Sequence, residues 1–519
     1  MYTLTKEFRT VAVMTAILLI GKSLGLVREM LFAAFVGVGE LGDAFILAST
    51  LPRMITDAMF AAAITASFIP VFTGQLQRGG KEKAFVLASN FLSIVLTASV
   101  VVTACAMLLA PLIVGLGAAD FAPYYADLTV ALLRIMLPLI VISCAAFTFV
   151  GVLQSFGQFY IPAAMSLVAN GVIIAYYVFF FDSFGVFGLA VVFLLGWASQ
   201  LAIQLPFLKK YGYRYSFTLD FKAPGISEIS KLIAPAMVFV WVLPINLQVN
   251  IFSVTHIVGG GVAIGLSNTV YTIVTGIFVL SVANVIFPKL SRLAADADEA
   301  AIGATLLGAM KGLLYLLIPI TVGLVVVAPI LVHVLFLHGE FTLEGARLTW
   351  VALRWFAVGI VGFGMQNVLA RGFFAYRDGR TPLMAGVAAV AINAAISIGL
   401  VGRLGVAAPA LGSSVAMTVC AVMLFAVMYT RNPAIWDKRA TLDILKMLVC
   451  ALAMGFAAHN VRWNRAIIAN AFPDGIVVLA AVAAGGALAY LALTYVLQVS
   501  EARMIVDAAR SFLKRKARP

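Results

Sequence analysis

The sequence predicts an all-α polytopic membrane protein with fourteen transmembrane helices, arranged as two six-helix lobes related by a parallel repeat plus two C-terminal helices. Of the 519 residues, 63% are hydrophobic and only 11% are charged. The mean hydropathy of +1.07 is far above that of soluble domains. Apolar segments long enough to cross about 30 Å of hydrocarbon recur along the chain. The second part of the chain also repeats motifs of the first part, which indicates a duplication.

Short polar connections separate the candidate spans. Several spans exceed the roughly 20 residues that one crossing needs, so we expect tilted helices or helices that extend beyond the bilayer. Pro52, Pro138 and Pro244 lie within spans and are candidate kinks. The predicted spans are residues 10–36, 42–74, 85–115, 128–155, 160–181, 184–208, 227–253, 262–288, 303–335, 346–375, 382–401, 405–429, 441–459 and 474–497.

The duplication appears in two pairs of motifs. The Leu-Arg pair that ends at Arg134 returns at Arg354, and SFIPVF around Pro70 is echoed by VIFPKL around Pro288. The two members of each pair lie six spans apart along the chain. Because six is even, both copies have the same orientation in the membrane. The predicted organisation is an N-lobe at 1–210, a C-lobe at 225–430, a helix pair at 441–497 and a basic cytoplasmic tail at 500–519.

Basic residues lie mainly in alternate connections between the spans. This set contains the QLQRGGKEK, LKKYGYRY and YRDGRTP connections and the C-terminal FLKRKARP. Cytoplasmic loops carry the excess of lysine and arginine in membrane proteins. The pattern therefore predicts a multi-pass protein of the cytoplasmic (inner) membrane with both termini in the cytoplasm.

Other functional classes lack support in the sequence. The net charge of +13 comes from basic residues scattered through loops, without an aromatic patch, so we expect no nucleic-acid partner. There is no Walker, dinucleotide-binding or HExxH motif. We therefore predict no enzyme activity, no catalytic residues, no cofactor and no metal site. The cysteines stand singly in apolar segments, at Cys105, Cys144, Cys420 and Cys450.

Charged residues inside membrane-length segments mark the candidate binding site. A charged side chain at the bilayer centre costs roughly 2.5 to 3.5 kcal/mol on insertion scales, so it persists mainly beside a partner or a wet cavity. The formal charges of this set sum to zero, so its members either bind a polar substrate or pair with one another. The candidate substrate-binding residues are Lys22, Arg28, Glu29, Asp43, Arg53 and Asp57.

Further polar residues in the seventh and eighth spans could face a cavity. Hydrogen bonding between helices is an equally good explanation for them. These residues are Asn246, Gln248, Asn250, Asn268 and Thr269.

Four stretches together resemble the MurJ (MviN) family of lipid II flippases, within the multidrug/oligosaccharidyl-lipid/polysaccharide exporter superfamily. They are residues 21–52, 132–163, 286–292 and 335–382. The resemblance implies fourteen helices and a lipid-linked substrate, an undecaprenyl-diphosphate disaccharide peptide that moves from the inner to the outer leaflet. Lys22, Arg28, Glu29 and Asp43 match charged positions of the family.

The sequence also departs from the family pattern. Where relatives have an Arg-Arg pair and then Ala-Glu-Gly, this chain has Thr56-Asp57 and then Phe60-Ala61-Ala62. Where they have Asp-Arg in the eighth helix, it has Asn268-Thr269. Arg53 lies one helical turn before Asp57 and could supply a cation to the same region.

The leading hypothesis is therefore a lipid II flippase that works by alternating access and is driven by a coupling ion or the membrane potential. One alternative is an exporter of another polyprenyl-diphosphate glycan, or an ion-coupled small-molecule exporter of the same superfamily. The other is a transport-inactive membrane scaffold for the cell-wall machinery.

Overall fold

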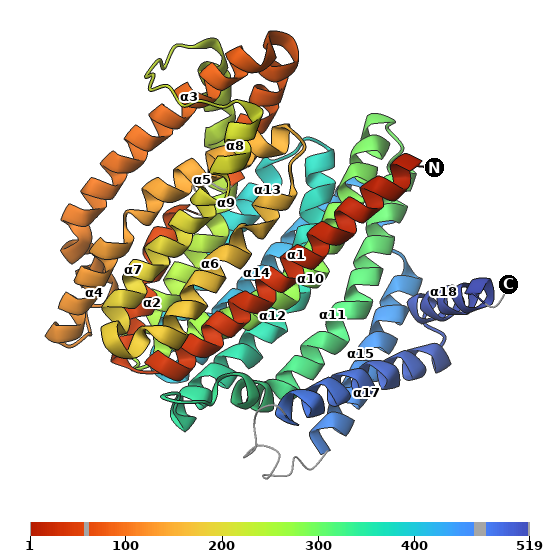
Figure 1. The fold of residues 1–519 in the computed structure, drawn as a ribbon. Helices are drawn as coiled ribbons and strands as arrows, with labels where there is room; N and C mark the ends of the chain where they lie inside the picture. The colour runs from red at the N-terminus through yellow and green to blue at the C-terminus, as the bar shows by residue number, and fades with distance from the viewer. Residues whose placement is uncertain (1, 57–61, 461–473, 517–519) are drawn as a thin grey trace. The chain divides into compact units, whose positions relative to one another are not determined.

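The computed structural model describes residues 2–56, 62–460 and 474–516 (Figure 1). Among these residues all regular secondary structure is helical, which confirms the all-α prediction. Each predicted span falls on one or two helices. Eleven helices within the described ranges are long and apolar enough to cross a membrane, so the chain is a multi-pass membrane protein, and the count of fourteen is consistent with this.

The first compact unit consists of Met1–Val262 and His338–Phe341. Within it, α1 packs on α6, α3 packs on α5 and α9, and α6 packs on α7. Its helices are α1 (Tyr2–Val36), α2 (Glu40–Thr56), α3 (Ala62–Gly117), α4 (Pro123–Met136), α5 (Leu139–Ser155), α6 (Tyr160–Phe179), α7 (Phe181–Ala202), α8 (Leu205–Tyr211) and α9 (Pro224–Ser253), followed by the first turn of α10 (Gly260–Ala295).

The second compact unit consists of Ala263–Leu337 and Thr342–Pro519. Here α12 packs between α11 and α14, and α13 packs on α14. After α10 its helices are α11 (Glu299–Phe336), α12 (Leu343–Ala375), α13 (Arg380–Leu404), α14 (Ala407–Arg431), the short η2 (Pro433–Ile435), α15 (Lys438–Asn460), α17 (Asp474–Val496) and α18 (Ser500–Lys516).

Packing and duplication divide the chain at different places. The duplication assigns residues 225–430 to the second lobe, whereas α9 packs on α3 in the first unit. The compact units show which helices are in contact in this structure. A duplication instead concerns which segments of the chain superpose on one another. The lobe boundaries taken from the repeat therefore stay a prediction.

Two arginines in equivalent positions of the motifs make the same contact in their separate units. Nε of Arg134 donates to the carbonyl of Met107 on α3 at 3.2 Å, and Nε of Arg354 donates to the carbonyl of Val325 on α11 at 2.9 Å. Each arginine thus ties its helix to a long helix earlier in the chain. A matched structural role of this kind supports the duplication.

The backbone also repeats at two glycines. Gly185 has φ 52° and ψ −145°, and Gly405 has φ 55° and ψ −137°. These dihedrals fall in a region that only glycine adopts without strain. The break near the start of α7 and the turn after α13 therefore have the same local geometry.

The predicted QLQRGGKEK connection contains no separate loop. It lies within α3, where Gly80 interrupts the helix with φ 76° and ψ 178°. Glycine accepts this φ because it has no Cβ. The fourth predicted span is interrupted instead, because α4 ends at Met136 and α5 begins after Pro138.

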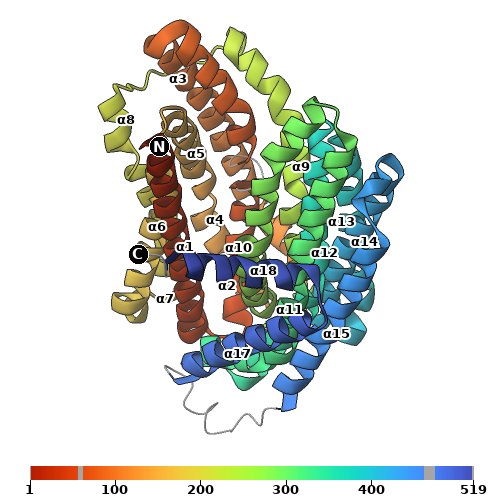
Figure 2. The ribbon, with the colours of Figure 1, turned by 90° about the vertical axis from the view of Figure 1, so that its right-hand side faces the viewer.

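The C-terminal tail is largely a helix. In Figure 2, α18 folds back from α17, and the turn between them contains Gln498 with φ 60°. Val499 and Ala502 are completely buried. Nζ of Lys311 on α11 lies 2.7 Å from a carboxylate oxygen of Asp443 on α15 and 3.2 Å from one of Glu501 on α18. The basic sequence alone predicted a tail, because Lys311 and Asp443, which hold α18 in place, are distant from it in the chain.

Candidate functional site

Arg28 is the best-supported candidate for binding an anionic group. From α1 it forms an ion pair with the neighbouring Glu29. Its Nη1 donates to Oδ1 of Asn170 on α6 at 3.2 Å, and its guanidinium carbon lies 5.5 Å from the ring centroid of Phe193 on α7. Three helices of the first unit therefore fix the position of one guanidinium.

Glycine allows α1 and α6 to approach closely near this arginine. A Cβ at Gly21 would lie 2.4 Å from Oγ of Ser166, far inside van der Waals contact. Nδ2 of Asn170 donates to the carbonyl of Gly21 at 3.2 Å. The amide of Asn170 thus bonds α1 through its nitrogen and Arg28 through its oxygen. This second contact orients the guanidinium.

The guanidinium retains hydrogen-bonding capacity. The side chains of Arg28 and Glu29 are 18% and 14% exposed, so the pair is neither fully buried nor freely solvated. Arginine has five N–H donors in a planar fork, and the two protein contacts leave some of them unused. A planar fork of this kind can bind phosphate oxygens bidentately.

The other two predicted cations have no acidic partner in the described residues. Lys22 is exposed on α1, and Arg53 is partly exposed near the end of α2. Within the described ranges neither forms an ion pair. Asp57, the predicted neighbour of Arg53, lies outside the described residues. Arg28 and Glu29 are therefore the members of this set that form an ion pair with each other among the described residues.

Asp43 occupies a different environment. Its carboxylate accepts hydrogen bonds from the backbone N–H of Gly259 at 2.6 Å and of Val262 at 2.9 Å. The residue is 3% exposed, and a Cβ at Gly261 would lie 3.0 Å from Oδ1. The carboxylate therefore caps the N-terminus of α10, where helix dipoles favour negative charge. Both of its oxygens are in use, although its predicted role in substrate binding stays a prediction.

The polar residues of α9 are buried. Asn246, Gln248 and Asn250 are 4%, 6% and 2% exposed. Neither atom of the Gln248 amide has a hydrogen-bond partner among the described residues. An unsatisfied buried amide is costly, so Gln248 is the member of this group best suited to meet a polar ligand or water.

The polar pair of α10 belongs to the second unit. Asn268 and Thr269 are both partly buried. The hydroxyl of Thr269 donates to the carbonyl of Gly265 in its own helix at 3.1 Å. The family resemblance implies a charged residue at this position, and a hydroxyl bonded in this way does not replace it.

Sequence reasoning missed Asn170 and Phe193. Asn170 is the lone amide in the apolar segment YIPAAMSLVANGVIIAYYVF, and it is 7% exposed. A single buried amide in a membrane span is itself a signal for an interhelical contact. Phe193 carries no such signal, because its role depends on the packing of α7 beside α1.

A family model described as "Lipid II flippase MurJ" matches residues 32–482, which is most of the chain. The chain belongs to the MurJ family. The resemblance proposed from the sequence motifs is therefore confirmed. The MurJ family is one of transporters of lipid-linked peptidoglycan precursors, not a family defined by catalysis.

Curated relatives of the MurJ family match over most of their length. "Probable lipid II flippase MurJ" of Rhizobium tropici is 26% identical over 475 residues, covering 89% of this chain and 88% of the relative. The protein of the same description from Vibrio cholerae is 28% identical over 396 residues, covering 73% and 75%. "Lipid II flippase MurJ" of Burkholderia cenocepacia is 25% identical over 480 residues, covering 88% and 91%.

Solved structures share the fold. One described as "Lipid II flippase MurJ, inward closed conformation" has a TM-score of 0.79 at 22% identity, covering 94% of this chain and 98% of that one. An inward-facing multidrug resistance MATE family transporter of the MOP superfamily has a TM-score of 0.68 at 16% identity, covering 82% and 98%. At these identities the likeness shows the fold alone.

Proposed function

We propose that this protein carries lipid II, the undecaprenyl-diphosphate-linked peptidoglycan precursor, from the inner to the outer leaflet of the cytoplasmic membrane. Membership of the MurJ family is the observation that carries the proposal. The chemistry agrees with it, because Arg28 presents a positioned guanidinium within an apolar protein. A diphosphate offers the oxygen geometry that such a fork binds.

In this proposal Arg28 binds the diphosphate, while Glu29 and Asn170 hold its orientation. Lys22 and Arg53 supply further positive charge as the headgroup enters. Gln248 offers an amide for the sugar or peptide. Asp43 acts indirectly, by fixing the start of α10.

Transport would proceed by alternating access of the two lobes. The headgroup would enter from the cytoplasm, the lobes would rock about it, and it would leave on the outer side. The prenyl chain would remain in lipid along the last two spanning helices. No nucleotide-binding motif occurs in the sequence, so we propose that an ion gradient or the membrane potential drives the cycle.

A second candidate is an exporter of a different polyprenyl-diphosphate glycan. At two positions where the family pattern has a cation, Thr56 and Thr269, this chain has a hydroxyl that is hydrogen-bonded within the protein. Thr56 is fully buried and its hydroxyl accepts a hydrogen bond from Ser143 at 3.1 Å. Thr269 bonds its own helix. Both candidates require the same diphosphate chemistry at Arg28.

Complementation tests the proposal. A bacterial strain depleted of its own lipid II flippase should grow when this protein is expressed. Failure to grow at a normal membrane level, with rescue of a strain that lacks another polyprenyl-diphosphate glycan exporter, would favour the second candidate. Rescue of the first strain that persists after Arg28→Ala would show that Arg28 does not bind the diphosphate. Rescue of neither strain, at a normal membrane level, would favour a scaffold that does not transport.

A further inference from the structure

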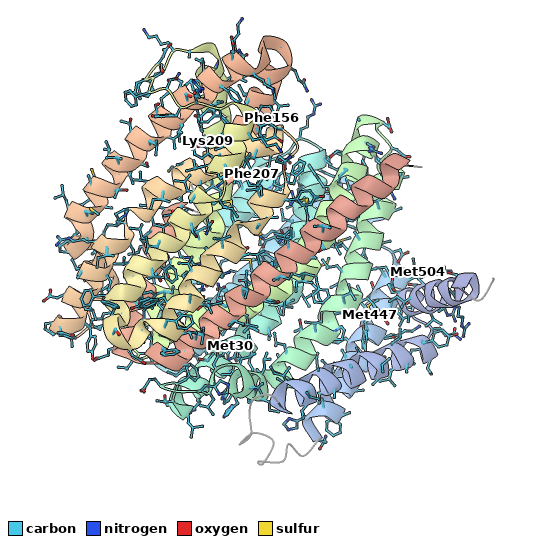
Figure 3. All side chains as sticks on the ribbon, in the orientation of Figure 1. Met30, Phe156, Phe207, Lys209, Met447 and Met504 are labelled. Atoms are coloured by element: carbon cyan, nitrogen blue, oxygen red, sulfur yellow. The ribbon has the colours of Figure 1, made fainter. Side chains whose placement is uncertain are left out.

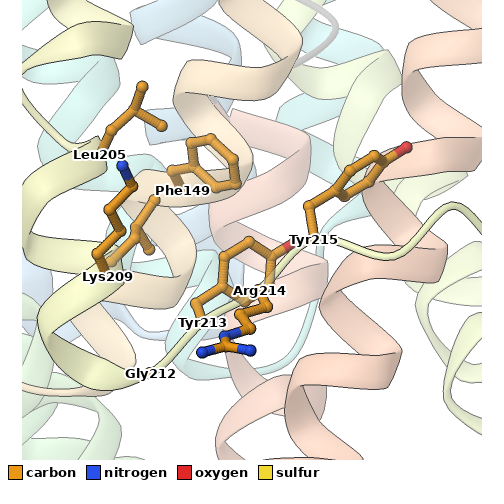
Figure 4. Close-up of a pocket in the computed structure, with 8 residues that line it drawn as sticks. Phe149, Leu205, Lys209, Gly212, Tyr213, Arg214 and Tyr215 are labelled. Atoms are coloured by element: carbon orange, nitrogen blue, oxygen red, sulfur yellow. The ribbon is translucent and has the colours of Figure 1, made fainter.

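A cavity of about 620 Å³ lies at the end of α8 in the first unit. Figure 4 shows Leu205, Phe149 and Lys209 on one side of it and Tyr213 and Arg214 on the other. This pocket is far from the candidate substrate site. In Figure 3, Lys209 lies well apart from Met30, which is two residues after Arg28 on α1.

The pocket has an apolar base. Phe149 of α5 and Leu208 of α8 are 7% and 2% exposed, so they form part of the core. Leu205 lines the same pocket and is 41% exposed. An apolar base with an open apolar edge suits a hydrocarbon chain better than a fully hydrated metabolite.

Two uncompensated cations lie at its rim. Lys209 and Arg214 both line the pocket and are exposed. Neither forms an ion pair with another residue of the described ranges. Two like charges beside one cavity attract an anion, and phosphate oxygens accept hydrogen bonds from both lysine and arginine.

The wall that carries Arg214 is fixed to α3. The backbone of Asp220 and the amide of Asn90 exchange two hydrogen bonds, of 2.8 and 2.9 Å. The hydroxyl of Tyr215 lies 2.9 Å from that of Ser93. The segment 213–221 is therefore held along α3 by side chains, although it contains no helix. The pocket is thus formed before any ligand arrives.

The same segment exposes a row of aromatic side chains. Tyr215, Phe217 and Phe221 are 47%, 68% and 66% exposed. Large aromatic side chains at the end of a membrane span favour the interface between lipid headgroups and water. The row therefore indicates that the mouth of the pocket lies at headgroup level.

We propose that this pocket binds an anionic phospholipid of the cytoplasmic leaflet. The phosphate lies between Lys209 and Arg214, and an acyl chain lies against Leu205 and Phe149. We assign the cytoplasmic leaflet because the pocket lies in the basic LKKYGYRY connection, which the charge distribution predicts to be cytoplasmic. The site is independent of the substrate route, so its test does not depend on whether the protein transports lipid II.

Native mass spectrometry of the purified full-length protein with phosphatidylglycerol and with phosphatidylcholine tests the site. The double variant K209Q/R214Q should bind phosphatidylglycerol about tenfold more weakly or worse, while its thermal unfolding stays unchanged. The control K210Q/K222Q removes the same charge from neighbouring exposed positions that do not line the pocket. It should bind phosphatidylglycerol like the parent.

A second variant tests the lipid chain. Leu205→Gln should weaken long-chain phosphatidylglycerol several-fold and leave the dihexanoyl form unaffected, because only the long chain reaches the apolar edge. Three results would overturn the proposal. The parent protein could bind phosphatidylcholine as tightly as phosphatidylglycerol, or both double variants could lose the same affinity for phosphatidylglycerol. Inorganic phosphate at millimolar concentration could also displace phosphatidylglycerol.

Discussion

At the scale of single residues, two predicted site residues have opposite surroundings. Arg28 has fixed partners on one side and unused N–H donors on the other, whereas both oxygens of Asp43 accept backbone hydrogen bonds. The same sequence argument, that charge in a span is costly, selected both. What separates them is whether the surrounding structure already satisfies the charge.

Replacing Arg28 with alanine should abolish transport while the protein remains in the membrane. Loss of a charge-assisted hydrogen bond costs about 1.5 to 3 kcal/mol, or roughly ten- to 150-fold in binding. Arg28→Lys should recover little, because one ammonium cannot contact Glu29, Asn170 and a diphosphate together. Complementation at matched membrane levels measures this.

Arg403→Ala is the matched control, because Arg403 is an exposed arginine at the end of α13. It should grow like the parent. Arg53→Ala should be nearly as harmful as Arg28→Ala, because Arg53 is on the same helix as Thr56, which stands where the family pattern has a cation. Parental growth of both Arg28→Ala and Arg53→Ala would contradict the diphosphate assignment.

The carboxylate of Asp378, between α12 and α13, should make stability depend on pH. Burial alone would raise its pKa, but hydrogen bonds from Thr381 and Arg431 outweigh burial and hold the pKa below the ordinary 3.8. A depressed pKa in the folded state adds stability above pH 3.8, and this is lost as pH falls through the folded pKa.

We therefore expect Asp378→Asn to lower stability between pH 7 and pH 5 by up to about 1 kcal/mol, the size typical of a partly exposed pair. The difference from the parent should shrink below pH 3.8. Thermal unfolding of the purified protein across this range measures it. A difference that grows on acidification would show that the sign is wrong.

At the scale of elements, short turns decide which helices lie together. The turn between α11 and α12 packs on α1, where the backbone N–H of Glu340 donates to the carbonyl of Ala34 at 2.9 Å. Gly339 allows the turn to lie this close to α1. Its φ is 59°, and a Cβ at this position would lie 2.2 Å from the carbonyl oxygen of Ala34. The motif LFLHGEFT carries the resemblance to the family, and here the glycine has a packing reason.

Gly339→Ala should therefore be strongly destabilising, by about 3 kcal/mol or more, because neither backbone can move without displacing a helix. Gly157→Ala is the control. Gly157 also has a positive φ, of 76°, but a Cβ there meets open space. Its equivalent in the repeat, Arg377, tolerates φ 58° with a side chain.

The control should cost only about 1 kcal/mol, the strain of a left-handed residue. The unfolding temperature and the yield of monodisperse protein compare the two variants. If Gly339→Ala is no worse than Gly157→Ala, the close approach of the turn to α1 is not required for folding.

At the scale of the whole molecule, the distribution of charge predicts the orientation in the membrane. Basic residues recur in alternate connections, and the even number of predicted spans requires both termini on one side. Arg134 and Arg354 make matched contacts in the two units, as expected if the lobes are parallel copies.

Single cysteines introduced into a variant without the four native ones should report this topology. A cysteine at Arg78 should react only after the membrane is permeabilised, because the surrounding connection is rich in basic residues. A cysteine at Glu344, in the opposite set of connections, should react with an impermeant reagent in intact cells. The reverse pattern would overturn the orientation.

The sequence by itself determined the all-helical membrane class, the many membrane-length apolar segments and the family. These features depend on local hydrophobicity, on the cost of charge in lipid and on neighbours in the chain, all of which can be read along one dimension. Only the tertiary structure decided that Asp43 caps the start of α10, that Asn170 orients Arg28, and that α18 is fixed by Lys311. Each of those contacts joins residues far apart in sequence. Charge and hydropathy show that a buried polar group needs a partner, but which partner it finds depends on how the helices pack.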